Sequence, residues 1–373
     1  MKNLFVYGTL RHVPLLEAVL GKDVSDLQIA SAQLADHEVF AVKDQDFPII
    51  KAGDGHAEGL WLGALTETDV ARLQFYEGGF AYDLVPITVQ VAGESRPAEV
   101  FKSEAAWAPN GAWSLNSWVD RYGEWAVLGA LEEMSYFGIR SRDDVDGMLP
   151  MIRARATSQV QARTKNLALS PGGMTRADVT DVALTRPYAN YFTLDEYDLS
   201  FRRYDGANSD MVRRAVFVAT DAVIVLPYDP VRDRVLLIEQ FRPGPFARGD
   251  ALPWQLEPIA GRIDANETAE TTARREAMEE AGLTLDALHE VANCYASPGC
   301  TTEFYHIYLG ISDLPDEVVG VSGLEHEAED IRSFLYSFDE LMEMTDTMQA
   351  VNAPLVLSAL WLARHRDRLR TTA

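Results

Sequence analysis

The chain has 373 residues and a mass of 41.4 kDa, too long for one ordinary domain and about right for two or three. Apolar residue types make up 47% of the sequence and charged types 24%, a globular composition that excludes wholesale disorder. The formal charge of −24 argues against a general binder of nucleic acid or of anionic membranes. It is compatible with an enzyme that recruits divalent cations.

Cysteine content and hydropathy indicate a reduced, cytoplasmic setting. Cys294 and Cys300 are too few for a disulfide framework, and their spacing is not that of a zinc ribbon. The apolar run at 4–7 is too short for a signal peptide. No stretch approaches the roughly 20 apolar residues that cross a bilayer. We therefore expect no membrane partner.

Residues 1–150 mix strand and helix patterns and carry 11 basic and 23 acidic residues, a net charge of −12. Thr66 is placed to cap a helix through Phe75, because Asp69 completes a capping box three residues later. A second helix is expected at 118–134. The segments that read as strands are 4–7, 57–65 and 84–91. Together these elements predict a small α+β barrel-like domain.

Residues 151–187 differ in charge from both flanking blocks, with six basic and two acidic residues. They include Ser170-Pro171-Gly172-Gly173, a typical loop composition. We expect a basic connecting segment here.

Residues 188–373 carry a net charge of −16 and alternate strands with helices. Two strands separated by Tyr228-Asp229-Pro230 suggest a hairpin. A helix over Thr268 to Ala281 should end at Gly282, a natural residue for that place. The expected strands are 222–226, 234–240, 289–295 and 304–309, and a closing helix is expected at 354–365. This pattern predicts a mixed sheet flanked by helices.

The segment from 261 to 283 carries the strongest chemical signal. Glu276, Glu279 and Glu280 fall within about one helical turn, and Glu276 and Glu280 share one face because they are four residues apart. Like charges at this spacing repel, and a cation bound between them turns the unfavourable interaction energy into a favourable one. Hard oxygen ligands of this kind suit Mg²⁺ or Mn²⁺. A solvated acidic helix face is the commoner explanation of one acidic pair, so the surrounding residues decide.

Those surrounding residues form an eight-position pattern. It consists of Gly261, Glu267, Arg275, Glu276, Glu279, Glu280, Gly282 and Leu283. The pattern resembles the Nudix box, the signature motif of the Nudix family of hydrolases. The resemblance implies that Glu276 and Glu280 bind metal and that Glu279 lies near the metals. It also implies that Glu267 and Arg275 form an ion pair that holds the loop on the helix.

The flanks of the box look like the ADP-ribose pyrophosphatase branch of that family, over about residues 188–365. The matching segments are Glu239-Gln240-Phe241-Arg242, residues 254–261, residues 297–303 and residues 327–331. Cys300 departs from the branch, where a second glycine is common, and so does the Glu325-His326-Glu327 run. The branch implies hydrolysis of ADP-ribose to AMP and ribose 5-phosphate. Another nucleoside diphosphate derivative stays open as the substrate.

The same resemblance implies a set of metal-binding and catalytic residues. Mg²⁺ (or Mn²⁺) would be bound by Glu276, Glu280, Glu329 and the backbone carbonyl of Ala260. Glu327 would be the general base, because it lies beyond the box and metal proximity would keep it ionised. Spacing alone does not decide between Glu327 and Glu329 as the base, and only the resemblance orders them.

Three arginines and one acid are candidates for binding the substrate. Arg242 and Arg214 could clamp phosphate or ribose with the guanidinium fork, and Arg262 is a further candidate. Glu303 would accept hydrogen bonds from a ribose hydroxyl. Arg242 could instead form a surface ion pair, and Arg213 could take the place of Arg214.

Two aromatic residues are candidates for stacking on adenine. Tyr191 and Phe192 occupy the corresponding place in the branch, often from the partner subunit of a homodimer. An aromatic residue such as Phe192 could equally belong to the core.

The N-terminal block carries a second resemblance. Val6-Tyr7-Gly8-Thr9-Leu10-Arg11 and residues 73–78, followed by Tyr82, resemble two signatures of the γ-glutamylcyclotransferase-like fold over about residues 1–110. Backbone N–H groups of Tyr7, Gly8, Thr9 and Leu10 can bind a substrate carboxylate, and Gly8 permits close approach. Glu77 occupies the position of the acid/base carboxylate. It could also simply cap a turn.

We therefore expect an α+β two-domain protein. A γ-glutamylcyclotransferase-like small β-barrel with helices spans 1–150, the connecting segment spans 151–187, and a Nudix α/β/α sandwich with a mixed sheet spans 188–373. Such a fusion resembles proteins associated with bacterial tellurite resistance. The leading hypothesis is a Mg²⁺-dependent ADP-ribose diphosphatase that acts on a small nucleotide sugar, has no nucleic-acid partner and forms a homodimer through the Nudix domain. The alternative is a sensor whose N-terminal domain recognises a γ-glutamyl or small acidic ligand.

Overall fold

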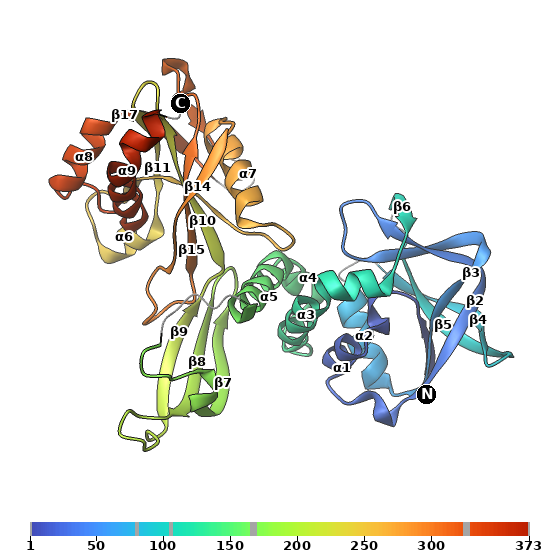
Figure 1. The fold of residues 1–373 in the computed structure, drawn as a ribbon. Coiled ribbons are helices and arrows are strands. Elements are labelled where there is room, and N and C mark those ends of the chain that lie inside the picture. Colours follow the sequence, from blue (N-terminus) through green and yellow to red (C-terminus); the bar gives the residue numbers. More distant parts are fainter. Residues whose placement is uncertain (1, 79–81, 104–106, 165–169, 324–328, 372–373) are drawn as a thin grey trace. The chain divides into compact units, whose positions relative to one another are not determined.

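The computed structural model describes residues 2–78, 82–103, 107–164, 170–323 and 329–371 (Figure 1). The chain divides into two compact units, Met1–Leu167 (unit 1) and Ala168–Ala373 (unit 2). Within the described residues, no helix combines the length and the hydropathy that crossing a membrane requires.

Unit 1 is built around a closed barrel of five strands (Figure 1). The ring runs β3–β1–β5–β4–β2 and closes because β2 also pairs with β3, while β6 extends β2. The strands are β1 (Lys2–Val6), β2 (Gln28–Val42), β3 (Pro48–Leu65), β4 (Tyr82–Val91), β5 (Glu94–Ser103) and β6 (Pro109–Ala112). The predicted barrel is confirmed, and ring closure leaves its five strands with few unpaired edges.

Alternation along the strands divides the apolar side chains of unit 1 between two cores. Successive residues of a strand point to opposite faces of a sheet. Phe5 and Trp61 belong to the core inside the barrel. Their neighbours Leu4, Val6 and Leu62 belong to the core between the barrel wall and the helices.

Among the described residues of unit 1, α-helices lie beside the barrel. They are α1 (Val13–Leu20), α2 (Glu67–Gly78), α3 (Leu115–Met134), α4 (Arg142–Asp146) and α5 (Leu149–Thr164), with short 3₁₀ turns η1 (Thr9–Arg11) and η2 (Val24–Asp26). The predicted capping box opens α2: the Thr66 N–H donates to the Asp69 carboxylate at 2.9 Å, and the Asp69 N–H donates to the Thr66 hydroxyl at 3.1 Å. α5 packs on α3 inside unit 1, although residues 151–164 fall in the segment expected to connect the domains.

Unit 2 contains a mixed sheet of eight strands and a separate sheet of three. The strands of the large sheet are β10 (Asp221–Asp229), β11 (Arg234–Phe241), β12 (Trp254–Glu257), β13 (Ile259–Arg262), β14 (Ala287–Tyr295), β15 (Phe304–Ile311), β16 (Val321–Ser322) and β17 (Ile331–Ser337). β10 and β15 pair in parallel and the other pairs are antiparallel. The predicted hairpin is formed by β10 and β11, with Tyr228 opposite Val235.

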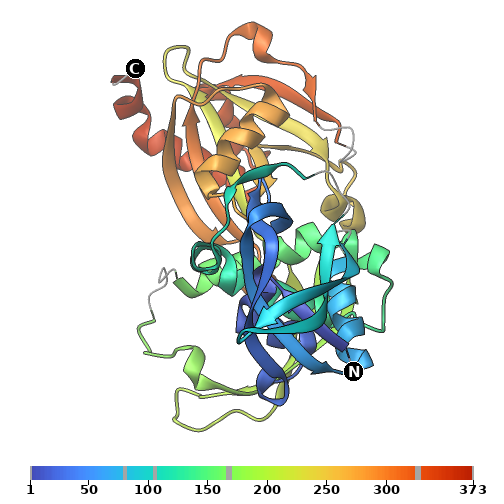
Figure 2. The same cartoon turned by 90° about the vertical axis from the view of Figure 1, so that its right-hand side faces the viewer.

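Helices cover both faces of the large sheet, which confirms the predicted sandwich. They are α6 (Pro243–Arg248), α7 (Ala269–Ala281), α8 (Phe338–Asp346) and α9 (Ala353–Thr371), with 3₁₀ turns η3 (Arg176–Asp178) and η4 (Asp316–Val318). Val223 and Val225 pack against α7, where the small Ala277 is fully buried. Leu226 and Tyr228 face α8 and α9. Figure 1 shows α7 and α9 on opposite sides of the strands, and Figure 2 shows α7 in front of them.

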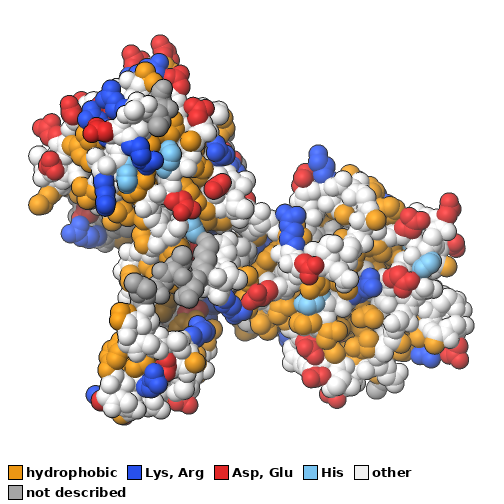
Figure 3. Space-filling model, in the orientation of Figure 1, with side chains coloured by type: hydrophobic (Ala, Val, Ile, Leu, Met, Phe, Trp, Pro, Cys, Tyr) orange, Lys and Arg blue, Asp and Glu red, His pale blue; other side chains and the backbone are white. Residues whose placement is uncertain are grey.

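The small sheet of unit 2 carries many exposed apolar side chains. It consists of β7 (Val179–Ala189), β8 (Thr193–Phe201) and β9 (Val212–Val218), in that order. Nearly every residue of β7 is exposed, including Leu184 and Tyr188. Figure 3 shows hydrophobic side chains on the surface of this lobe. β7 begins at Val179, so the segment expected to connect the domains contributes most of a strand.

Candidate active site

A strand, a loop and a helix position the glutamates of unit 2. β13 lies antiparallel to β10, with Gly261 opposite Val223. α7 follows Thr268, whose hydroxyl accepts a hydrogen bond from the Thr271 N–H. The helix ends at Gly282, whose φ of 63° is a conformation that glycine adopts without steric cost. The structure thus contains the predicted helix and its glycine end.

Arg275 ties the loop to the helix. Its Nε and one terminal nitrogen each lie 2.9 Å from a carboxylate oxygen of Glu267, a bidentate geometry. The other terminal nitrogen lies 2.8 Å from both Glu276 and Glu279. Burial acts to raise the pKa of Glu267, but hydrogen bonds from Arg275 and Thr272 outweigh it and hold the pKa below its usual value. The ion pair expected between Glu267 and Arg275 is therefore formed.

Two carboxylates, Glu280 buried and Glu276 partly buried, lie between α7 and β13. Glu280 is 2% exposed and accepts a hydrogen bond from the Ala260 N–H at 3.1 Å. Burial raises the pKa of Glu280 well above its usual value, and the charge of Glu276 adds to the effect. Burial also raises the pKa of Glu276 to about 7, against the lowering effect of Arg275. A nearby cation would therefore stabilise the charged form of both carboxyl groups.

A third carboxylate completes the donor set. The charge of Glu329 raises the pKa of both Glu276 and Glu280, which places it near the pair. Glu327, the predicted base, lies outside the described residues. Among the residues that the structure describes, no three His, Cys, Asp or Glu side chains already converge as a finished metal site. The donor set nonetheless fits a divalent cation, because buried carboxylates that repel one another are stabilised by a positive ion among them.

Tyr191, Phe192 and Arg262 come together beside β13. Arg262 donates a hydrogen bond to the Tyr191 hydroxyl at 3.0 Å, and its guanidinium carbon lies 5.7 Å from the centroid of that ring. The ring centroids of Tyr191 and Phe192 lie 4.8 Å apart. Both rings are exposed, so Phe192 does not belong to the core of this chain. The three side chains form an accessible aromatic and cationic surface.

Glu257 is a site residue that we did not anticipate. Arg242 donates from Nε to Glu257 at 2.7 Å, and Asn352 donates to the other carboxylate oxygen at 3.1 Å. Arg242 is therefore paired, but with a buried acid that fixes its direction rather than with a surface acid. The charge of Arg242 lowers the pKa of Glu280, so the guanidinium lies near the glutamate pair. The sequence did not single out Glu257, because polar and apolar residues alternate in Trp254-Gln255-Leu256-Glu257 as in an ordinary strand.

The remaining candidates lie on β9 and before β15. Arg213 forms a two-point ion pair with Asp198, at 2.8 and 2.6 Å, whereas Arg214 donates to the Arg213 carbonyl. Arg214 thus remains the better candidate of the two for a ligand. Glu303 accepts a hydrogen bond from the Tyr305 hydroxyl at 3.0 Å, which orients its carboxylate.

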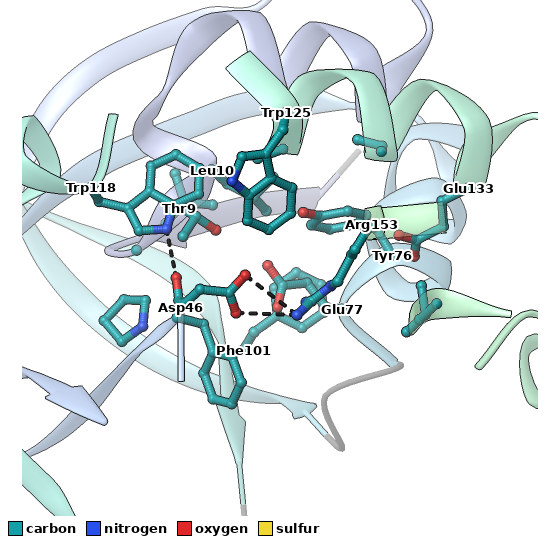
Figure 4. Close-up of a pocket in the computed structure, with 18 of the residues that line it drawn as sticks. Thr9, Leu10, Asp46, Tyr76, Glu77, Phe101, Trp118, Trp125, Glu133 and Arg153 are labelled. Carbon is teal, nitrogen blue, oxygen red and sulfur yellow. Dashed lines mark hydrogen bonds and ion pairs between the residues drawn. The ribbon is translucent and has the colours of Figure 1, made fainter. Parts of the chain in front are cut away.

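Unit 1 contains a separate cavity of about 70 Å³, room for several water molecules. Its wall includes the predicted loop Tyr7-Gly8-Thr9-Leu10 and the predicted acid Glu77 (Figure 4). A side-chain carbon at Gly8 would lie 2.9 Å from Pro48, so only glycine fits without a shift. The structure therefore brings together the two segments that the sequence indicated.

The environment of this cavity favours the protonated form of the Glu77 carboxyl group. Burial raises its pKa to about 8, and the charge of Glu133 adds to the effect. A carboxyl group with such a pKa is protonated at neutral pH and can donate a proton or a hydrogen bond.

Replacement of Glu77 by Gln (E77Q) should stabilise unit 1 at pH 8 but not at pH 5. Folded Glu77 keeps a proton that the unfolded chain releases above its usual pKa of 4.5, so wild-type stability falls between about pH 4.5 and 8, by up to about 1.4 kcal/mol per pH unit. Denaturant unfolding followed by tryptophan fluorescence at both pH values measures the difference. The exposed Glu67 on the same helix provides the control variant E67Q, and an E77Q effect independent of pH would contradict the assignment.

Comparison with known proteins places both units in families. Residues 218–358 match the family model "NUDIX domain", and residues 4–125 match "Gamma-glutamyl cyclotransferase, AIG2-like". The chain is 38% identical over 193 residues to an ADP-ribose pyrophosphatase of Escherichia coli strain K12, covering 52% of this chain and 91% of that protein. It is 31% identical to an ADP-ribose pyrophosphatase of Haemophilus influenzae, covering 49% of this chain and 85% of that protein. It is also 31% identical to a GDP-mannose pyrophosphatase of Yersinia pestis, covering 38% and 71%. The chain therefore belongs to the Nudix hydrolase family and carries an N-terminal domain of the AIG2-like γ-glutamyl cyclotransferase family.

Proposed function

We propose that unit 2 hydrolyses the diphosphate of ADP-ribose, giving AMP and ribose 5-phosphate, with Mg²⁺ as the metal. The observation that carries this proposal is the pair of Glu276, which is partly buried, and Glu280, which is buried and held against β13, in a chain 38% identical to an ADP-ribose pyrophosphatase. Nudix hydrolases generally need a divalent metal. Mn²⁺ could replace Mg²⁺ because the proposed ligands are all hard oxygens.

Four groups would hold the metal: the carboxylates of Glu276, Glu280 and Glu329 and the backbone carbonyl of Ala260. A bound divalent ion would neutralise the diphosphate and lower the pKa of the attacking water. Arg275 supports this arrangement by fixing the loop and by drawing Glu276 and Glu279 to one side of the helix. Glu327 as the base remains our prediction.

The substrate would be oriented by side chains around the glutamates. Arg242, directed by Glu257, would bind phosphate oxygens, with Arg214 as a second cation. The surface formed by Tyr191, Phe192 and Arg262 would bind adenine by stacking and cation–π contact. Glu303 would accept a hydrogen bond from a ribose hydroxyl.

A substrate panel tests the proposal directly. The full chain with Mg²⁺ should release AMP from ADP-ribose with a kcat/KM at least about tenfold above that for GDP-mannose hydrolysis, a difference of about 1.4 kcal/mol in transition-state binding. Chromatography of the nucleotide products measures both reactions. A preference for GDP-mannose would favour the relative from Yersinia pestis as the guide to the substrate.

The small sheet of unit 2 supports a homodimer. Exposed apolar patches of this kind mark interaction surfaces in folded proteins. The exposed side chains that would be covered are Val182, Leu184, Tyr188, Phe201 and Phe217. Analytical ultracentrifugation should give twice the chain mass of 41.4 kDa, and Leu184→Glu should give the chain mass itself. A monomeric wild type would contradict the dimer.

The cavity of unit 1 favours a second candidate function. Glu77 lies beside the Tyr7–Leu10 loop, and burial raises its pKa to about 8, which supports binding of a small ligand and proton transfer to it. Release of 5-oxoproline from a γ-glutamyl amine, lost in E77Q, would support a cyclotransferase. Ligand binding without turnover would support a sensor. The association with tellurite resistance stays a prediction.

A further inference from the structure

Part of the cavity wall in unit 1 comes from the second half of α3 and from α5, which lie beyond the matched AIG2-like segment. That segment ends at residue 125, whereas Glu133 on α3 and Leu149, Ile152 and Arg153 on α5 line the same cavity. Among the described residues of the wall, Arg153 supplies the cationic side chain. The chain beyond the matched segment therefore adds a positive charge to the pocket.

Arg153 is placed to face a ligand. One of its terminal nitrogens lies 3.3 Å from both carboxylate oxygens of Asp46, and its guanidinium carbon lies 5.9 Å from the ring of Trp125. Asp46 is itself anchored, because Trp118 donates to its backbone carbonyl at 2.5 Å. Figure 4 shows Arg153, Asp46 and Glu77 directed toward the same space.

The ion pair between Arg153 and Asp46 is longer than a typical charge-assisted pair. A charge-assisted pair normally spans about 2.7–2.9 Å, so 3.3 Å is long. The Arg153 side chain is 28% exposed, whereas Arg155 on the same helix is 1% exposed and pairs with Glu132. The nearby Arg142 is engaged by Glu133, by Asp146 at 2.6 Å and by the Phe75 carbonyl at 2.7 Å. Neither Arg142 nor Arg155 lines the cavity.

We propose that Arg153 is a ligand-binding residue of unit 1, whose guanidinium donates hydrogen bonds to the carboxylate of a small molecule in place of Asp46. The proposal rests on the second candidate function, because it requires that the cavity bind a ligand. The other acids of the wall do not oppose an anion. Glu133 is neutralised by Arg142, and Glu77 carries a proton at neutral pH. Trp118, Trp125 and Phe101 supply apolar contact for the rest of the molecule.

Two isosteric probes test this assignment in the full chain. Glutaramate carries one carboxylate, and glutaramide carries an amide in its place. Ligand-observed NMR titration should show wild type binding glutaramate at least about tenfold more tightly than glutaramide, which corresponds to about 1.4 kcal/mol. Arg153→Gln should remove this preference. Arg163→Gln is the matched control, because Arg163 lies on α5 like Arg153 but forms an exposed ion pair with Glu124 of α3.

Two further variants separate the possible failures. Arg153→Lys keeps the charge without the fork, so it should fold and lose only part of the preference, which covers the case in which Arg153→Gln does not fold. E77Q should keep the preference even if every turnover in unit 1 is lost, so failure of the Glu77 chemistry leaves this inference standing. Equal binding of the two probes by wild type, no binding of glutaramate, or an unchanged preference in both Arg153 variants would overturn it.

Discussion

Glu280→Gln (E280Q) should lower kcat for ADP-ribose by roughly three orders of magnitude, a loss of about 4 kcal/mol of transition-state stabilisation. The substitution keeps the size of the side chain, and the amide oxygen can still accept the hydrogen bond from the Ala260 N–H. It removes a negative charge from the most deeply buried acid of the cluster. Steady-state AMP release at saturating Mg²⁺ measures the effect.

The fold of E280Q should be at least as stable as that of wild type. The pKa of Glu280 is raised by burial and by Glu276, so its charged form is disfavoured in the folded chain. Removing that charge should raise the free energy of unfolding, the opposite of its effect on activity. Glu270→Gln is the control, because Glu270 lies exposed on the same helix. Activity of E280Q within about threefold of E270Q would remove Glu280 from the metal site.

Local spacing predicted much of this arrangement. The ends of α7 follow from Thr268 and Gly282, and the capping box of α2 follows from Thr66 and Asp69. These features depend on hydrogen bonds between residues at most a few positions apart, which a single sequence displays. The pair of Glu267 with Arg275 spans eight positions and was reached through the family resemblance.

Contacts between distant segments could not be predicted in the same way. Glu257 is joined to Asn352 across 95 positions, and Arg153 to Asp46 across 107. No periodicity links such pairs, because the turns and packing of a whole domain bring them together. The three-stranded sheet was missed for a related reason. Nearly every residue of β7 is exposed in the single chain, so that strand lacks the half-buried alternation from which strands are recognised.

Gly261→Ala (G261A) should reduce kcat/KM for ADP-ribose by about 100-fold or more while changing stability little. A methyl group at position 261 would lie 1.9 Å from an oxygen of Glu276 and 2.4 Å from its Cγ, so the carboxyl group must leave its place. Misplacing a reacting group by about 1 Å commonly costs that much in rate. The backbone of Gly261 is extended in β13, so alanine itself adopts it readily and the free energy of unfolding should change by about 1 kcal/mol at most.

A double-mutant cycle isolates the cause of that loss. Gly320→Ala is the matched control, because a methyl group there meets nothing within 4 Å, and it should retain wild-type activity. In the background of Glu276→Ala, which removes the clashing carboxyl, G261A should have no further effect on the residual rate. If G261A lowers kcat/KM only when the Glu276 carboxyl group is present, the loss of activity is due to the displacement of that carboxylate. Additive losses would mean instead that Gly261 serves the reaction through its backbone alone, independently of Glu276.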